Sequence, residues 1–101
     1  MIIIERKFNL KPDCREKFLN ILSDYFVNID NDPYVKTYAI VTTNSQDNCV
    51  ITRFIVENSE SWEKRMQQEY VCEFLKKSES LVDSIQTDTQ RIIKFYTEEN
   101  T

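Results

Sequence analysis

The 101-residue chain contains no glycine, although average usage would give about seven in a chain of this length. Loops that cradle phosphate groups, whether of the Walker or the dinucleotide-binding type, need glycine because the backbone must approach the ligand closely. The sequence therefore excludes both kinds of phosphate-binding loop.

Histidine is also absent. Its absence removes the most common general base, the most common zinc ligand and the partner that activates a catalytic serine or cysteine. Any catalysis has to use Asp, Glu, Lys, Cys or Tyr side chains, or a substrate that is itself reactive. We therefore expect no cofactor: no metal, no flavin and no haem.

The three cysteines, Cys14, Cys49 and Cys72, are odd in number and form no CxxC pair. This usage argues against a disulfide framework and is typical of a reduced, cytoplasmic protein. For each cysteine we favour a small buried hydrophobe over a catalytic thiol. The apolar run at residues 2–4 is too short for a signal peptide or a membrane span, so we expect a cytoplasmic location.

The chain carries 13 basic and 17 acidic residues, a formal net charge of −4. An acidic surface gains nothing from counterion release, which argues against binding to nucleic acid or to an anionic membrane. Apolar residues make up 41% and charged residues 30%, as is usual for a globular protein. We expect one domain over residues 1–101, with a core at about 2–97 and a polar tail at 98–101.

In the first half of the chain, the spacing of apolar residues changes from that of a strand to that of a helix and back again. Residues 2–10 alternate as a strand does, with Ile2, Ile4, Phe8 and Leu10 on one face. After Pro12, apolar residues recur every three or four positions up to residue 29, which predicts a helix. Residues 34–43 and 49–56 read as two further strands, joined by a polar loop at 44–48.

The second half predicts one more helix and one more strand. Asn58 and Ser59 are typical N-caps, and apolar residues continue at helical spacing from Trp62 to Val82, with a bend near 68–70. A last strand is expected at 85–96. The order β-α-β-β-α-β predicts a ferredoxin-like, split βαβ α+β fold, in which a four-stranded antiparallel sheet carries both helices on one face.

The third predicted strand is apolar on both sides. Cys49, Ile51 and Ile55 alternate with its core residues, and Ile92 is expected near them on the outer sheet face. An apolar sheet face of this kind needs a cover. A second copy of the chain is the simplest cover, so we expect a homodimer through the sheet face, a dimeric α/β barrel.

Three stretches carry a resemblance to a known family: Phe8–Asp13 at the turn into the first helix, Pro33–Tyr38 at the turn into the second strand and its start, and Val50–Met66. The clearest is VENSESWEKRM at 56–66, with its acid, serine and aromatic at a helix start. In their order over residues 2–97 these features resemble the antibiotic-biosynthesis-monooxygenase-like domains of the dimeric α/β-barrel superfamily.

The resemblance implies two alternative functions. One is a cofactor-independent monooxygenase that acts on a small aromatic or quinol-type substrate, which itself supplies the electrons. The other is a non-catalytic dimeric domain that binds a ligand or another protein, because some members of the superfamily have no known chemistry. Haem degradation is not expected, since the sequence has no histidine to ligate haem iron.

The chain departs from the family pattern at several positions, one of which is Asp13, where the family usually has a glycine after the proline. The frequent histidine early in the second helix is replaced by Arg65, and the Glu-x-Trp of the third strand falls on Phe54 and Val56. Asn9 lies in the strand where haem-degrading members carry an asparagine. The usual polar site residues are thus replaced, which leaves catalysis itself undecided.

Five residues are candidates for a pocket: Trp62, Arg65, Tyr38, Asn9 and Tyr70. Trp62 is either a pocket wall or a core residue, and the tyrosines either donate to a substrate oxygen or bond locally. Arg65 either holds an anionic or phenolate oxygen, or is a solvated arginine paired with Glu60, Glu63 or Glu69.

Arg6, Arg53 and Arg91 each interrupt an apolar, alternating face. A charge that points into a barrel is costly unless it is paired. Each of these arginines therefore marks either a buried site or an edge or dimer seam, where a carboxylate binds it.

Overall fold

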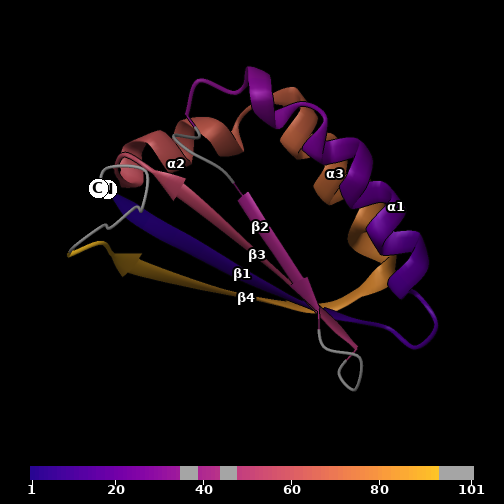
Figure 1. Cartoon of the computed structure of the whole chain (residues 1–101). Helices are drawn as coiled ribbons and strands as arrows, with labels where there is room; N and C mark the ends of the chain where they lie inside the picture. Colours follow the sequence, from indigo (N-terminus) through magenta and orange to yellow (C-terminus); the bar gives the residue numbers. More distant parts are fainter. Residues whose placement is uncertain (35–38, 44–47, 94–101) are drawn as a thin grey trace, which may run out of the picture.

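The sheet is formed by β1 (Ile2–Leu10), β2 (Ala39–Thr43), β3 (Cys49–Val56) and β4 (Val82–Arg91). A computed structural model describes residues 1–34, 39–43 and 48–93. The four strands lie in the order β2-β3-β1-β4, and each neighbouring pair is antiparallel (Figure 1). The first strand of the chain is therefore central.

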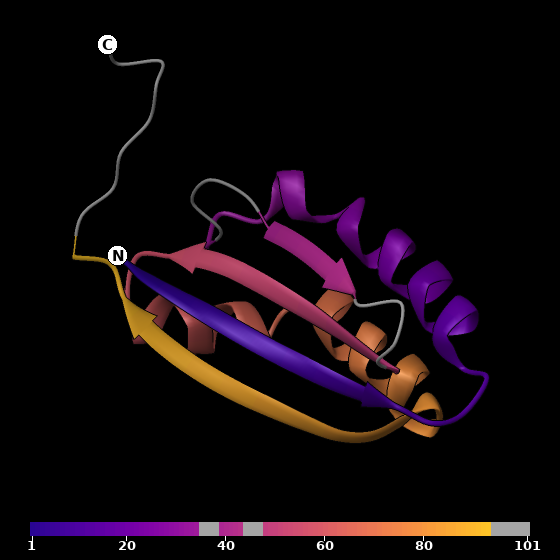
Figure 2. The same cartoon turned by 60° about the horizontal axis from the view of Figure 1, so that its bottom comes forward.

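Three helices cover one face of this sheet: α1 (Arg15–Phe26), α2 (Ser59–Met66) and α3 (Glu69–Ser78) (Figures 1 and 2). Figure 2 shows the other face without a helix over it. The α+β class, the antiparallel sheet and the one-sided helices agree with the sequence-based prediction. Among the described residues, no helix is both long and apolar enough to cross a membrane.

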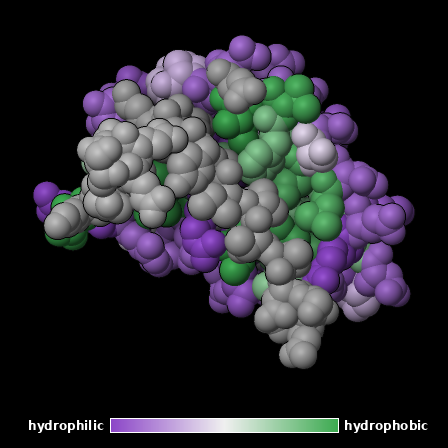
Figure 3. Space-filling view, in the orientation of Figure 1, coloured by the Kyte–Doolittle hydropathy of each residue, from purple (hydrophilic) through white to green (hydrophobic). Residues whose placement is uncertain are grey.

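The core lies between the sheet and the helices. Strand alternation turns Ile4, Phe8 and Leu10 of β1 inward, where Phe8 meets the rings of Phe18 and Phe74 at centroid distances of 5.1 and 5.9 Å. The apolar surface gathers beside α1 and α3, whereas the outward side of these helices is hydrophilic (Figure 3). The helices are thus amphipathic, and their apolar side is directed at the sheet.

The predicted bounds of β1 and β3 match the structure, and the predicted bend separates α2 from α3. The first helix, however, ends at Phe26, and Ile29 begins a short 3₁₀ turn. Asn28 explains the early end, because its side-chain amide donates to the carbonyl of Asp24 at 3.3 Å and satisfies a helix C-terminal acceptor.

The predicted last strand was placed too late. The last helix ends at Ser78, a 3₁₀ turn covers Glu79–Leu81, and β4 begins at Val82. In the sequence, Leu81 and Val82 fit a helical apolar pattern as well as a strand pattern. In the structure the chain joins the sheet here, because Lys11 N donates to Leu81 O at 2.9 Å. The strand ends at Arg91, and residues 94–101, including the predicted tail, lie outside the described part.

The second strand was placed too early at its start. Tyr34 lies in a turn, because its backbone N–H donates to Asp32 Oδ1 at 2.8 Å instead of to a neighbouring strand. The observed strand starts at Ala39. Residues 35–38, which the prediction also assigned to this strand, lie outside the described part, as does most of the predicted loop at 44–48.

The outer sheet face is apolar along β3 but polar along β4. Cys49 and Ile55 are buried and Ile51 is half-buried, whereas an ion pair of 2.8 Å joins Glu5 to Arg53 at the centre of the face. The residues of β4 on this face are exposed and polar: Ser84, Gln86, Asp88 and Gln90. Of the residues expected on or near this face, Cys49, Ile51 and Ile55 lie on it, whereas Ile92 follows the end of β4.

Within the described residues, no disulfide joins Cys14, Cys49 and Cys72. Cys49 is buried and Cys14 is half-buried, but Cys72 is exposed on α3. The interpretation of each cysteine as a buried hydrophobe is therefore wrong for Cys72.

Candidate functional site

Helix α2 carries three of the side chains that matter here. Asn58 caps its first turn, because Asn58 Oδ1 accepts from Ser61 N at 2.8 Å. Trp62, Arg65 and Met66 follow at spacings of three and four, so all three lie on the side of α2 that faces the sheet.

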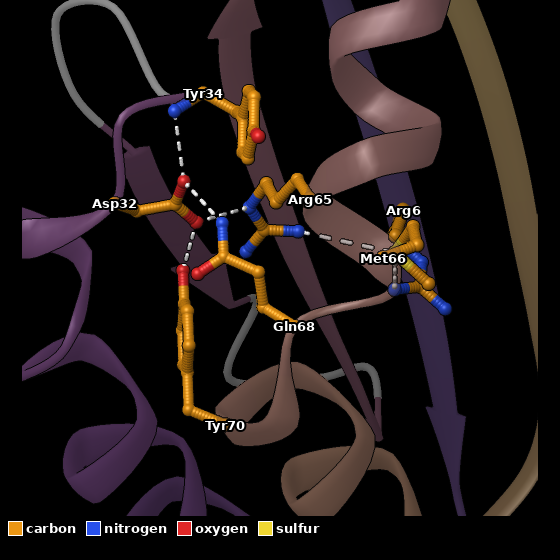
Figure 4. Close-up of polar contacts among 7 residues, drawn as sticks. All are labelled: Arg6, Asp32, Tyr34, Arg65, Met66, Gln68 and Tyr70. Atoms are coloured by element: carbon orange, nitrogen blue, oxygen red, sulfur yellow. Dashed lines mark hydrogen bonds and ion pairs between the residues drawn. The ribbon is translucent and has the colours of Figure 1, made fainter.

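Arg65 is fully buried and paired with Asp32. Its Nε lies 3.4 Å from Asp32 Oδ2, and both side chains are 0% exposed. The carboxylate also accepts from Tyr34 N at 2.8 Å, from Gln68 Nε2 at 3.0 Å and from the Tyr70 hydroxyl (Figure 4). These five residues, here called the Asp32 network, join the α1–β2 connection to the α2–α3 junction.

Aromatic rings surround the Arg65 guanidinium. Its central carbon lies 4.1 Å from the ring centroid of Phe54, 4.9 Å from Trp62 and 5.4 Å from Tyr25. Such cation–π contacts stabilise a desolvated guanidinium. Burial lowers the pKa of Arg65 to about 10, so the side chain remains charged at neutral pH.

Tyr70 contributes a proton to the network. Burial raises the pKa of its phenol above the usual 10.0, and the hydrogen bond to Asp32 acts in the same direction because only the neutral phenol can donate it. Tyr70 therefore stays protonated in the folded protein at pH values where a free tyrosine begins to ionise.

Arg6 is the second buried arginine, and its setting differs. Strand alternation turns it toward the helices, where it is 8% exposed and lies 5.3 Å from the ring centroid of Phe8 and 6.0 Å from Trp62. Its Nη1 is 3.8 Å from Met66 Sδ. Among the described residues no carboxylate pairs with Arg6, and burial lowers its pKa.

A cleft of about 410 Å³ opens beside Arg6, between α3 and the β1–β4 side of the sheet. Leu75, Val82 and Ile85 form its apolar wall. Its polar lining consists of Arg6, Lys76, Ser78 and Glu79. A buried cation therefore borders an apolar space that is open to small molecules.

The structure brings together three of the five predicted site residues. Trp62, Arg65 and Tyr70 meet around Asp32 and the aromatic rings. Asn9 lies on the opposite sheet face, where its amide donates to Ser84 Oγ at 3.0 Å. Tyr38 lies outside the described residues.

The expected surroundings of Arg65 are wrong in one respect. It is not a solvated arginine paired with a helix glutamate, because its side chain is fully buried against Asp32. Lys64 pairs with Glu60 instead, with 3.3 Å between Lys64 Nζ and Glu60 Oε1. Nor is Arg65 among the residues that line the cleft beside Arg6. Its buried charge instead holds Asp32.

Sequence reasoning missed Asp32 and Met66. Asp32 lies between the first predicted helix and the second predicted strand, and nothing near it in the sequence indicates a buried partner 33 positions away. Arg6 did leave a signal, since it interrupts the alternating face of β1. Within the described residues, no cluster of three or more Cys, Asp and Glu side chains could hold a metal ion.

No family model and no curated protein matches the sequence. Solved structures do match. A protein described as an antibiotic biosynthesis monooxygenase has a TM-score of 0.83 at 7% identity, over 93% of this chain and 100% of that one. A Nitrosomonas europaea protein, also described as an antibiotic biosynthesis monooxygenase, has a TM-score of 0.84 at 7% identity, over 93% of this chain and 100% of that one.

Rv0793 from Mycobacterium tuberculosis has a TM-score of 0.83 at 6% identity, over 95% of this chain and 98% of that one. At such low identities the likeness is one of fold. The chain therefore has the fold of antibiotic-biosynthesis-monooxygenase-like proteins, as the resemblance in sequence implied.

Proposed function

We propose that the cleft beside Arg6 binds a small aromatic or quinol-type molecule and that the protein is a cofactor-independent monooxygenase. The observation that carries this proposal is the buried charge of Arg6, which has no carboxylate partner in the part of the chain that the structure describes. A buried cation is costly unless an anion or strong acceptors compensate it. Among the described residues Arg6 has only a thioether sulfur as acceptor, and it borders an open cleft.

The cleft suits such a ligand in size and lining. Its volume of about 410 Å³ is within the range of small-molecule sites. Leu75, Val82 and Ile85 provide an apolar wall for a ring, and the guanidinium provides paired donors for an oxygen.

The guanidinium also has a chemical role. It favours the oxyanion of a phenol or enol over the neutral form, which lowers the pKa of the bound ligand. The electron-rich anion then reacts with O₂: one oxygen atom enters the substrate, and the other leaves as water with the two hydrogens that the substrate gives up. The names of the structural neighbours support this reaction class.

Binding is tested through the fluorescence of Trp62, the single tryptophan, whose ring lies 6.0 Å from Arg6. Dithranol and simple quinols are titrated into the wild type, into Arg6→Leu and into the control Arg53→Leu. Saturable quenching should weaken at least about tenfold in Arg6→Leu, the loss of one charge-assisted hydrogen bond. Arg53→Leu removes an arginine from the opposite face and should bind normally. Equal curves for all three proteins would refute the proposal.

Catalysis is tested separately with an oxygen electrode and with ¹⁸O₂. The monooxygenase predicts O₂ consumption with one labelled oxygen atom in the product. The second candidate is a non-catalytic, dimeric ligand-binding or interaction domain, favoured by the replaced polar residues at Phe54, Val56 and Arg65. Saturable binding without O₂ consumption would identify that alternative.

We also propose that two copies pair through the outer sheet face of a cytoplasmic protein. The apolar side of β3, with the half-buried Ile51, and the Glu5–Arg53 pair beside it support this arrangement. Sedimentation equilibrium at micromolar concentration should give twice the chain mass of 12.1 kDa. Ile51→Asp should give monomers or aggregates, because pairing would bury its charge. A monomeric wild type would refute the dimer.

A further inference from the structure

Two charged guanidiniums converge on one thioether sulfur. Met66 Sδ lies 3.8 Å from Nη1 of Arg6 and 3.9 Å from Nη1 of Arg65 (Figure 4). Arg6 comes from the central strand, whereas Met66 is the last residue of α2. The sulfur is the point at which the two buried cations of the core meet.

A thioether is a weak acceptor, and charged donors bond much better to oxygen. These donors are also poorly satisfied: Arg65 Nη2 has no hydrogen-bond partner among the described residues, and Arg6 has no carboxylate there. One oxygen atom added to the sulfur would create a strong acceptor where both guanidiniums already point.

We propose that Met66 is a site of reversible oxidation by hydrogen peroxide, promoted by Arg6 and Arg65, which then hold the sulfoxide. The sulfur attacks the peroxide, so that an S–O bond forms while the O–O bond breaks. The proton on the transferred oxygen passes to the departing hydroxide and gives water. Sulfur loses two electrons, and peroxide gains them.

The guanidiniums act on both sides of this step. They stabilise the negative charge that develops on the departing oxygen, and they donate to the sulfoxide oxygen once it has formed. Reductases return methionine sulfoxide to methionine. The sulfoxide would occupy the donors of Arg6, so oxidation would close the cleft's charged end to an anion. The inference itself needs no ligand and goes beyond the proposed function.

The chain supplies its own reference, since Met1 is its one other methionine and is 61% exposed. The purified protein is treated with hydrogen peroxide and digested with trypsin, which separates the two methionines. Fragmentation distinguishes oxidation at Met66 from oxidation at Cys72. Met66, although half-buried, should oxidise at least as fast as Met1, and methionine sulfoxide reductase should reverse the change.

The control variants test the role of the guanidiniums. In Arg6→Leu the rate at Met66 relative to Met1 should fall about tenfold, as for the loss of one charge-assisted contact. Arg53→Leu should leave the ratio unchanged. If Arg6→Leu does not fold, Arg6→Lys replaces it and should give an intermediate ratio. Slower oxidation of Met66 than of Met1 in the wild type, or a ratio insensitive to Arg6, would overturn the proposal. No ligand is present in this measurement, so its outcome is independent of whether the cleft binds dithranol.

Discussion

Arg65 and Arg6 are two buried arginines in the same aromatic core, but only Arg65 has a carboxylate partner among the described residues. Arg65 is held by Asp32 and three aromatic rings, whereas Arg6 contacts two rings and a sulfur beside an open cleft. Burial alone therefore does not mark a functional residue. Removing one partner of a buried ion pair destabilises the fold, whereas a buried cation without a carboxylate partner is available to a ligand.

The largest expected effect follows from breaking the compensated pair. Arg65→Leu leaves Asp32 buried without its cation, and we expect a loss of about 3–5 kcal/mol in the free energy of unfolding. Urea denaturation measures it. Arg65→Leu combined with Asp32→Asn should recover part of the loss, because the buried charge is then gone. A loss below about 1 kcal/mol in Arg65→Leu would show that the pair is not essential to the fold.

The next effect concerns the hydroxyl of Tyr70. Tyr70→Phe removes a hydrogen bond to a charged acceptor, and we expect a loss of about 1.5–3 kcal/mol at pH 7. The pKa of Tyr70 is raised in the folded state, so the folded protein keeps a proton that the unfolded chain releases above pH 10.0. This contribution is fully present below pH 10.0 and is lost as pH rises toward the folded-state pKa.

Urea denaturation of the wild type and Tyr70→Phe between pH 7 and 11 measures this dependence. The difference in stability between the two proteins should shrink at the alkaline end. A constant difference across this range would contradict the role assigned to the phenol proton.

A smaller effect is expected at the uncompensated arginine. Arg6→Leu removes a buried charge that has no carboxylate partner among the described residues. The free energy of unfolding should therefore fall by less than about 1 kcal/mol, or rise. The same variant should weaken ligand binding. Thermal denaturation provides the stability value, and a loss as large as that of Arg65→Leu would erase the distinction between the two arginines.

The smallest effect is expected one residue before Arg65. Lys64 pairs with Glu60 at 3.3 Å, but the two side chains are 54% and 73% exposed. Exposed pairs at this helical spacing contribute about 0.3–0.5 kcal/mol. Lys64→Met should therefore lower stability by no more than about 0.5 kcal/mol in urea denaturation, and this difference should vanish in 1 M salt. A larger loss would mean that the contribution of an ion pair to stability does not depend on its burial in this protein.

The sequence predicted the two strands that are rich in core residues: β1, whose two faces differ in polarity, and β3, which is apolar on both faces. The bounds of β1 and β3 were correct for this reason. β4 gave no such signal, because its residues after Val82 are exposed and mostly polar. Its pairing with β1 determines its position, and that partner lies some 80 residues away along the chain.

The candidate site was predictable only where a residue violates a local pattern. Arg6 interrupts an alternating strand and could be recognised as unusual. Arg65 lies among other charged residues of α2, and its burial depends on Asp32, which lies outside every helix and strand that the sequence predicts. A contact between distant segments leaves no periodicity in either of them.

The central position of β1 has a consequence for folding kinetics. β1 pairs only with β3 and β4, so its hydrogen bonds require chain loops of about 40 and 70 residues to close. The entropy of closing these loops is lost before the ladders form, which slows folding relative to a helical bundle of equal length. The sheet cannot be completed until the last strand has been synthesised, and until then β1 has at least one unpaired edge, which a chaperone would recognise.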